Sequence, residues 1–188
     1  SYNGNMNISM PDLSSYNLMN SKEKLEFEKL AGRYTPSSST STPGEIELNR
    51  LYNEKLKIIE SGVDTYWLAE PLRTGVNQKH SLYVQGGEGN FLFGLGAGYN
   101  GISGVMKKST REVISGNIDL IYRMEKFQFS NKFSMSSTHF KNPIVSFQTY
   151  AEANPYYKKY NESGIIEKWL EKNDFFEAPN PLWNDTQN

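Results

Sequence analysis

The segment 127–137, FQFSNKFSMSS, constrains the fold most, because apolar and polar residues alternate along most of its length. The apolar set is Phe127, Phe129, Phe133 and Met135, and the polar set is Gln128, Ser130, Lys132, Ser134 and Ser136. A period of two is typical of a β-strand, whose successive side chains point to opposite faces. The segment therefore predicts a strand with one apolar face, and the question is what that face contacts.

The same period of two recurs elsewhere in the chain. Together the predicted strands lie near residues 1–10, 78–85, 91–99, 111–123 and 127–137. Tight turns are predicted at 86–90 and 124–126, and a looser loop at 101–110. The remaining segments, 11–77 and 138–188, are long connections. We therefore expect a mainly β fold, an antiparallel meander of about five strands with short helices in two long loops.

The first long connection begins with a predicted helix. Asn20 and Glu23 form a capping box before a helical segment that Gly32 ends. The stretch 35–42 that follows is rich in Ser, Thr and Pro, a composition typical of a mobile loop. The order of these signals predicts a short helix and then a flexible connection.

Two further helices are predicted. Thr42, Pro43 and Glu45 indicate a second capping box with Pro at the first helical position, and Gly62 ends this helix. A third helix is expected at 165–171, within the second long connection.

The parity of the strands places both long connections at the same end of the predicted sheet, because an even number of strands separates them. The turns at 86–90 and 124–126 lie at the opposite end. Long loops at one end and tight turns at the other are the asymmetry of an outer-membrane β-barrel. The alternative is a β-sandwich, in which apolar faces pack on a second sheet. No second set of strands is present in the sequence to cover these faces.

Composition and motifs give little sign of catalysis or of nucleic-acid binding. Twenty Lys and Arg against 21 Asp and Glu leave a net charge of −1, which gives no reason to expect nucleic acid. Gly94-Leu-Gly96-Ala-Gly98 lacks the pattern of a nucleotide loop, and His80 and His139 lack partners at metal-ligand spacing. Because no nucleophile motif occurs either, we expect no enzyme, no catalytic residue, no cofactor and no metal site.

A row of small and polar residues is one candidate functional surface. Gly94, Gly96 and Gly98 share a strand face, and Asn117 and Asp119 lie on the same side of the next predicted strand. A functional interpretation is that the backbone here approaches another element closely inside a lumen. The alternative is a weakened or bulged strand.

The second candidate group is aromatic and lies in the second long connection. Candidate contacts for a ligand or a lid are Tyr150, Asn154, Tyr156, Tyr157, Tyr160 and Trp169. Flat aromatic faces stack on sugar rings or pack on a protein partner. The alternative is that these side chains anchor the loop itself.

Several short motifs occur along the chain in a definite order. They are Ser1-Tyr-Asn-Gly4, Leu18-Met-Asn-Ser21, Asp64-Thr-Tyr-Trp67, Gln78-Lys-His-Ser-Leu-Tyr-Val-Gln-Gly-Gly87, Gly98-Tyr-Asn100 with Gly104-Val, Asn154-Pro-Tyr-Tyr157 with Tyr160 and Gly164, and Asn180-Pro-Leu-Trp-Asn184. In this order the series resembles the early barrel of SusC-like TonB-dependent transporters of Bacteroidetes. The resemblance covers nearly the whole chain.

The resemblance implies that residues 1–188 are one N-terminal fragment of a 22-stranded transmembrane β-barrel, lacking the plug domain and the TonB box. In that family a SusD-like lipoprotein caps the extracellular mouth, and the TonB complex powers import of oligosaccharides or peptides. Apolar strand faces would contact lipid, while the Gly, Asn and Ser faces would face the lumen and plug. The segments 11–77 and 138–188 would be extracellular, and the stretch 35–42 matches no motif of the family.

We therefore expect part of an outer-membrane importer of oligosaccharides or other large nutrients, located in the bacterial outer membrane. One alternative is a secreted or surface carbohydrate-binding β-domain that folds alone. Another is a structural barrel protein without a transport role. The first alternative requires that the apolar faces be buried within one chain.

Overall fold

The structure, a computed structural model, describes residues 1–37 and 41–186. It divides into two compact units. The sheet unit consists of Ser1–Pro11 and Leu72–Pro143, and the loop unit of Asp12–Pro71 and Ile144–Asn188. Among the described residues, no helix is both long and apolar enough to cross a membrane. The assignment of the whole chain to one barrel domain stays a prediction.

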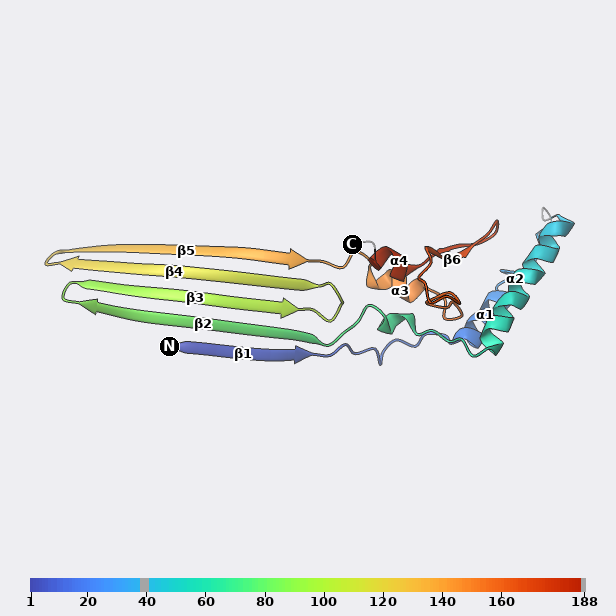
Figure 1. Ribbon diagram of the computed structural model, residues 1–188, viewed down its shortest axis with the longest axis horizontal. Helices are drawn as coiled ribbons and strands as arrows, with labels where there is room; N and C mark the ends of the chain where they lie inside the picture. Colours follow the sequence, from blue (N-terminus) through green and yellow to red (C-terminus); the bar gives the residue numbers. More distant parts are fainter. Residues whose placement is uncertain (38–40, 187–188) are drawn as a thin grey trace. The chain divides into compact units, whose positions relative to one another are not determined.

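The sheet unit, all of whose residues are described, is a five-stranded antiparallel meander (Figure 1). In chain order the strands are β1 (Tyr2–Ser9), β2 (Gly75–Glu88), β3 (Phe91–Ser103), β4 (Thr110–Met124) and β5 (Phe127–Lys141). The turns at 89–90 and 125–126 lie at one end of this sheet, because they join β2 to β3 and β4 to β5. The connection from β1 to β2 and the loop at 104–109 lie at the other end. The structure confirms the predicted meander. It also confirms that both tight turns lie at the end of the sheet opposite the long connections.

Four of the strands run further than their alternation predicts. β2 begins at Gly75 and β3 continues to Ser103, so the predicted loop at 101–110 shrinks to 104–109. β5 likewise continues to Lys141. The reason is that backbone hydrogen bonds extend the ladder through the row Gly101, Glu112 and His139, where side chains no longer alternate in polarity.

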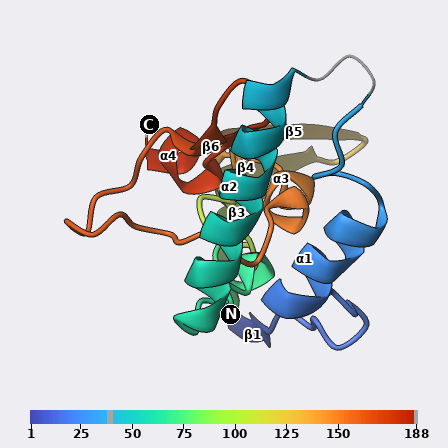
Figure 2. The same cartoon turned by 90° about the vertical axis from the view of Figure 1, so that its right-hand side faces the viewer.

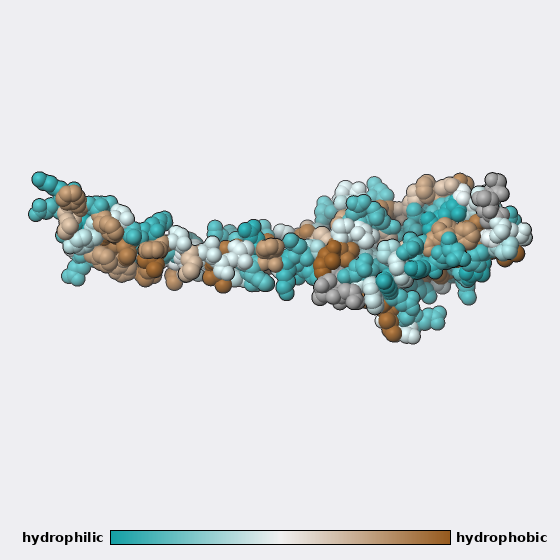
Figure 3. Space-filling view, turned by 90° about the horizontal axis from the view of Figure 1, so that it is seen from above, coloured by the Kyte–Doolittle hydropathy of each residue, from teal (hydrophilic) through white to brown (hydrophobic). Residues whose placement is uncertain are grey.

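The two faces of the sheet differ in polarity, because residues directly opposite each other in register share a face. Successive rows on one face are Val84, Leu95, Ile118 and Phe133, and then Tyr2, Leu82, Ala97, Gly116 and Met135. Rows on the other face are Ser81, Gly98, Ser115 and Ser136, and then Tyr83, Gly96, Asn117 and Ser134. Apolar side chains accordingly gather along one side of the sheet (Figure 3).

The sheet unit is a single layer without a core of its own. Its fully described residues include three that are buried, the glycines Gly75, Gly94 and Gly101. On the apolar face Phe133 is 63% exposed and Met135 is 79% exposed. The apolar face therefore has no cover within this unit.

The loop unit, by contrast, is built around a buried core. Its elements are α1 (Ser21–Leu30), α2 (Thr42–Glu60), the 3-10 helix η1 (Trp67–Ala69), α3 (Phe147–Glu152), β6 (Trp169–Lys172), β7 (Glu177–Pro179) and α4 (Pro181–Thr186). The helices α1 and α2 pack side by side (Figure 2). The core residues are Leu25, Tyr34, Ile59, Trp67, Val145, Tyr150, Tyr156 and Tyr157. Both long connections contribute to this core, so they fold as one unit.

The start of α1 matches the sequence prediction, whereas that of α2 lies one residue earlier than predicted. The Asn20 side chain accepts a hydrogen bond from the backbone N–H of Glu23, and the Glu23 side chain accepts one from Asn20, which confirms the capping box. In α2 the cap is Ser41 rather than Thr42, because Ser41 Oγ accepts from the backbone N–H of Gly44 at 3.4 Å. Residues 38–40 of the stretch predicted as mobile lie outside the described residues.

The predicted helix at 165–171 is wrong. Residues of this segment enter β6, which pairs with β7 as a short antiparallel hairpin. At its turn, Asn173 Oδ1 accepts hydrogen bonds from the backbone N–H groups of Phe175 and Phe176, at 2.9 and 2.8 Å. An Asn side chain that bonds the backbone two residues on is a turn signal, and here it outweighs local helix propensity.

Candidate functional site

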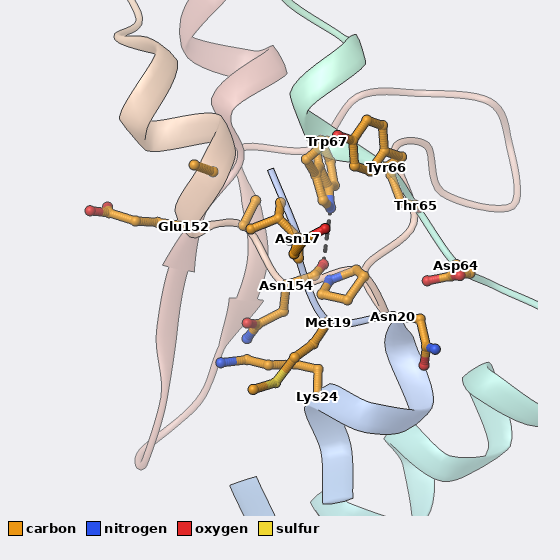
Figure 4. Close-up of a pocket in the computed structure, with 14 residues that line it drawn as sticks. Asn17, Met19, Asn20, Lys24, Asp64, Thr65, Tyr66, Trp67, Glu152 and Asn154 are labelled. Carbon is orange, nitrogen blue, oxygen red and sulfur yellow. Dashed lines mark hydrogen bonds between the residues drawn. The ribbon is translucent and has the colours of Figure 1, made fainter. Parts of the chain in front are cut away.

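Two of the ordered motifs meet in the loop unit, although 87 residues separate Trp67 from Asn154 in sequence. The backbone N–H of Thr65 donates to the carbonyl of Pro155 at 2.7 Å, and its hydroxyl donates to the carbonyl of Tyr157 at 2.8 Å. The Trp67 indole N–H donates to the carbonyl of Asn154 at 2.9 Å (Figure 4). These bonds hold the segments 64–67 and 154–157 together.

The other two motifs of the loop unit also form hydrogen bonds that stabilise its fold. Asp64 Oδ1 accepts from both the backbone N–H and the hydroxyl of Ser21, each at 2.9 Å, which ties the start of α1 to the segment 64–67. Asn180 is buried, and its side chain accepts from the backbone N–H of Leu182 at 3.0 Å at the start of α4. The motifs therefore place residues that fix the loop unit's fold.

A pocket of about 640 Å³ opens between the segments 17–20, 64–67 and 151–155 (Figure 4). Its wall mixes the rings of Tyr66 and Trp67 with the side chains of Met19 and Lys24. Trp67 is nearly fully buried, while Tyr66 is 45% exposed, so Tyr66 is the ring that solvent reaches. A mostly apolar pocket of this size with a few polar groups suits a small ligand or the side chain of a partner.

Three of the predicted ligand contacts are buried. Tyr150, Tyr156 and Tyr157 are 2%, 0% and 7% exposed and belong to the core. Tyr156 and Tyr157 are among the residues that line a pocket, but most of each ring is packed in the core. Their burial supports the alternative interpretation, in which they anchor the loop.

A buried carboxylate explains why tyrosines occupy this core. Glu28 accepts hydrogen bonds from the hydroxyls of Tyr34 and Tyr156, at 3.0 and 2.9 Å, and from the Asn154 side-chain amide at 3.3 Å. Its carboxylate also lies 3.8 Å from Nε of Arg33. Burial raises the pKa of the Tyr156 hydroxyl, and burial with the nearby Glu28 raises that of Tyr34, so both remain donors at neutral pH.

A second buried pair extends this network. Lys55 is 4% exposed and donates to Glu171 at 2.5 Å. The Tyr157 hydroxyl donates to the other oxygen of Glu171. Burial, followed by the hydrogen bond to Glu171, raises the pKa of Tyr157. Asn154, Tyr156 and Tyr157 thus act together, as parts of a buried polar network.

The two remaining aromatic candidates lie at the surface of the loop unit. Tyr160 is 49% exposed and Trp169 is half-buried, and both line a second pocket of about 500 Å³. The ammonium group of Lys172 lies 4.3 Å from the centre of the Trp169 ring. Tyr160 and Trp169 are therefore the predicted aromatic contacts with ring surface available to a ligand.

The glycine row of β3 makes room for side chains of its neighbouring strands. A Cβ at Gly94 would overlap the Tyr83 hydroxyl, and one at Gly96 would overlap the Asn117 amide. A Cβ at Gly98 would approach Ser115 Oγ to 2.6 Å. Because β3 pairs with both neighbours without a register shift, no bulge explains these glycines. That this face contacts a lumen or plug stays a prediction.

Asp119 is the centre of a polar cluster beside this row. It accepts from the Asn117 side-chain amide at 3.2 Å and from the Tyr83 hydroxyl at 3.5 Å, and lies 3.8 Å from the ammonium group of Lys132. Asn117 and Asp119, two of the candidate lumen-facing residues, therefore lie together on the polar face, close to Gly94 and Gly96.

Several residues of these sites escape prediction from sequence. Met19, Tyr66 and Trp67 line the larger pocket, and the motifs that contain them gave a family resemblance but no ligand chemistry.

No cluster of three or more His, Asp or Glu side chains that could hold a metal ion occurs within residues 1–37 and 41–186. No protein-family model matches this chain, and no curated protein matches it either.

Proposed function

We propose that this chain forms part of the wall of an outer-membrane, TonB-dependent importer of the SusC-like kind. The complete importer would take up oligosaccharides or other large nutrients, with a SusD-like lipoprotein and the TonB complex as partners. The observation that carries the proposal is the single-layered sheet, in which most apolar side chains lie on one face and most amide and hydroxyl groups lie on the other. Alternation between a lipid face and a lumen face is the pattern of outer-membrane barrel strands.

The height of the apolar face supports this proposal. Apolar rows extend along β4 from Ile114 to Met124, and the ten residue-to-residue steps between them correspond to about 34 Å at about 3.4 Å per step. A strand tilt of about 40° reduces this length to about 26 Å, close to the roughly 25 Å apolar band of such barrels. The face therefore has the dimension that a membrane requires.

The apolar band also has a boundary of the expected chemistry. Toward the long-loop end, the next row of the same face carries the polar side chains of Gln78, Glu112 and His139, with Met6 at its β1 edge. At this edge of the apolar band the rings of Tyr2 and Tyr99 flank His80, and the Tyr2 hydroxyl is hydrogen-bonded to His80 Nδ1 at 2.7 Å. Aromatic girdles mark the interfaces of membrane barrels, and these rings support an interface at this level.

Labelling of single cysteines tests the proposal, because the chain contains no Cys. Phe133 and Ser134 are neighbours on β5 that point to opposite faces. In isolated outer membranes we expect a membrane-impermeant maleimide to label Ser134→Cys and to leave Phe133→Cys unlabelled, while a lipid-soluble maleimide labels Phe133→Cys. The pair Asn117→Cys and Ile118→Cys is the matched control on β4. Equal labelling of both faces by the impermeant reagent would overturn the proposal.

The carbohydrate-binding domain that folds alone gains no support from the structure. Such a domain requires a cover for Phe133, Met135 and their neighbours, and the sheet unit supplies none. A cover within the chain would shield Phe133→Cys from both maleimides, so labelling of Phe133→Cys by the lipid-soluble reagent distinguishes a lipid-facing sheet from this alternative.

A further inference from the structure

The polar face of the sheet unit carries a concentration of positive charge. Along its fully described strands the charged residues of this face are Lys79, Arg111, Asp119, Arg123 and Lys132. Four cations and one anion give this face a net charge of +3, whereas the whole chain has a net charge of −1. A surface with charge of one sign attracts solutes of the opposite sign, the more so inside a cavity with walls of low dielectric constant.

One of these cations lies between apolar side chains. In register Arg111 has Ile102 opposite it on β3 and Phe140 opposite it on β5. Both neighbours are open to solvent, Ile102 at 37% and Phe140 at 63%. Other apolar side chains of this face are Leu92, Val113 and Ile121, and what sets Arg111 apart is that both of its cross-strand neighbours are apolar.

These three residues line a hollow of about 580 Å³ at the long-loop end of the sheet. Ser109, Thr110, Thr138 and Asn142 complete its wall, and these side chains carry three hydroxyls and an amide. Within the described part of the chain, Arg111 forms no salt bridge. The hollow thus combines a cation without a charge partner, an exposed aromatic ring and hydrogen-bonding groups.

Each part of this combination suits a different part of an acidic sugar. The planar guanidinium group matches a carboxylate, with two parallel N–H donors for its two oxygens. Ile102 and Phe140 lie on either side of Arg111, so a carboxylate bound there would have apolar surface next to it. The flat ring of Phe140 fits the apolar face of a sugar ring, and the hydroxyls and the amide fit its hydroxyl groups.

We propose that this hollow binds the carboxylate-bearing sugar of an acidic oligosaccharide, such as a uronic acid unit. The role of the hollow as a substrate site at the entrance of a lumen rests on the proposed function. The geometry of the hollow depends on the sheet alone. The substrate class of the importer is then narrowed to anionic glycans, which the positive face attracts.

Binding of oligogalacturonate and of its neutral methyl ester to the purified protein in detergent tests this proposal by titration calorimetry. We expect the acid to bind and the ester to bind at least tenfold more weakly. Because hydrogen bonds to charged groups contribute about 1.5–3 kcal/mol, Arg111→Gln should weaken binding of the acid about 10- to 100-fold. Arg123→Gln is the matched control, since Arg123 lies on the same face at the turn end and donates to Gln128.

A second variant separates the ring from the charge. Phe140→Ala should weaken binding of both the acid and the ester, because it removes a stacking surface and no charge. Equal affinity for acid and ester, an unchanged affinity in Arg111→Gln, or no binding of either probe would overturn the proposal. The labelling pattern of Phe133→Cys and Ser134→Cys is independent of any glycan, so failure of this site leaves the barrel proposal intact.

Discussion

The sheet unit and the loop unit differ in where their apolar side chains lie. The loop unit buries Trp67, Tyr150, Tyr156 and other rings around a hydrogen-bonded carboxylate. The sheet unit exposes rings such as Phe133. Burial of apolar area is the main favourable term in folding, so the loop unit contains its own source of stability. The sheet unit requires a cover from outside, and its polarity pattern indicates which face the cover must contact.

The largest expected effect is that the sheet unit unfolds, and the loop unit does not, when detergent is removed. With its apolar face in water, the sheet should lose the whole of a typical stability of about 5–15 kcal/mol, whereas the loop unit keeps its core. Hydrogen exchange with mass spectrometry, on the monomeric fraction with and without detergent, measures this difference. We expect amides of β3 and β4 to lose protection in water and amides of α2 to keep theirs.

The control lies within the same chain, because α2 and β3 are followed in one sample. Loss of protection in both units together would mean that the loop unit depends on the sheet. If both units keep their amide protection in water, the apolar face of the sheet must be covered without lipid or detergent.

The second prediction concerns the charge that the loop unit buries. Glu28→Ala leaves the hydroxyls of Tyr34 and Tyr156 without their acceptor and Arg33 without its ion-pair partner, and breaking a buried charged pair costs about 3–5 kcal/mol. Glu26→Ala is the matched control, an exposed carboxylate on the same helix, with an expected change within about 0.5 kcal/mol. The chain's three Trp residues, Trp67, Trp169 and Trp183, all belong to the loop unit, so Trp fluorescence in a urea titration follows this unit alone.

Similar destabilisation by both variants would show that the Glu28 network adds nothing beyond general helix effects. A loss confined to Glu28→Ala would show that buried polar bonds hold the two long connections together.

The strands could be predicted from sequence because alternation reports a one-sided sheet directly, as in 127–137. Their ends could not, since backbone pairing continues through Gly101 and His139 without a side-chain signal. The helix predicted at 165–171 failed for a related reason. Its segment pairs with β7, and the Asn173 side chain that forms the turn was the local sign of that pairing.

The candidate sites were predicted less well than the strands. A tyrosine that stacks on a ligand and one that donates to a buried carboxylate look alike in sequence, and the partner of Tyr156, Glu28, lies 128 residues away. Arg111 could not be predicted as a binding residue, because its two apolar neighbours belong to other strands. Periodicity assigns a residue to a face, but only the register shows which residues lie next to it.

The smallest expected effect concerns the glycine row and again contrasts two environments. At Gly96 a Cβ would displace the Asn117 amide and its hydrogen bond to Asp119, whereas at Gly116, on the opposite face, the nearest atom lies 3.8 Å away. Gly96→Ala should therefore destabilise the sheet in detergent by about 1 kcal/mol. Gly116→Ala should stabilise it slightly, by up to about 1 kcal/mol, because Gly is unfavourable within a strand. Thermal melts followed by circular dichroism measure both changes. Because the overlap involves only the Asn117 side chain, adding Asn117→Ala should make Gly96→Ala harmless, and a Gly96→Ala cost that persists in the double variant would place the obstruction in the backbone instead.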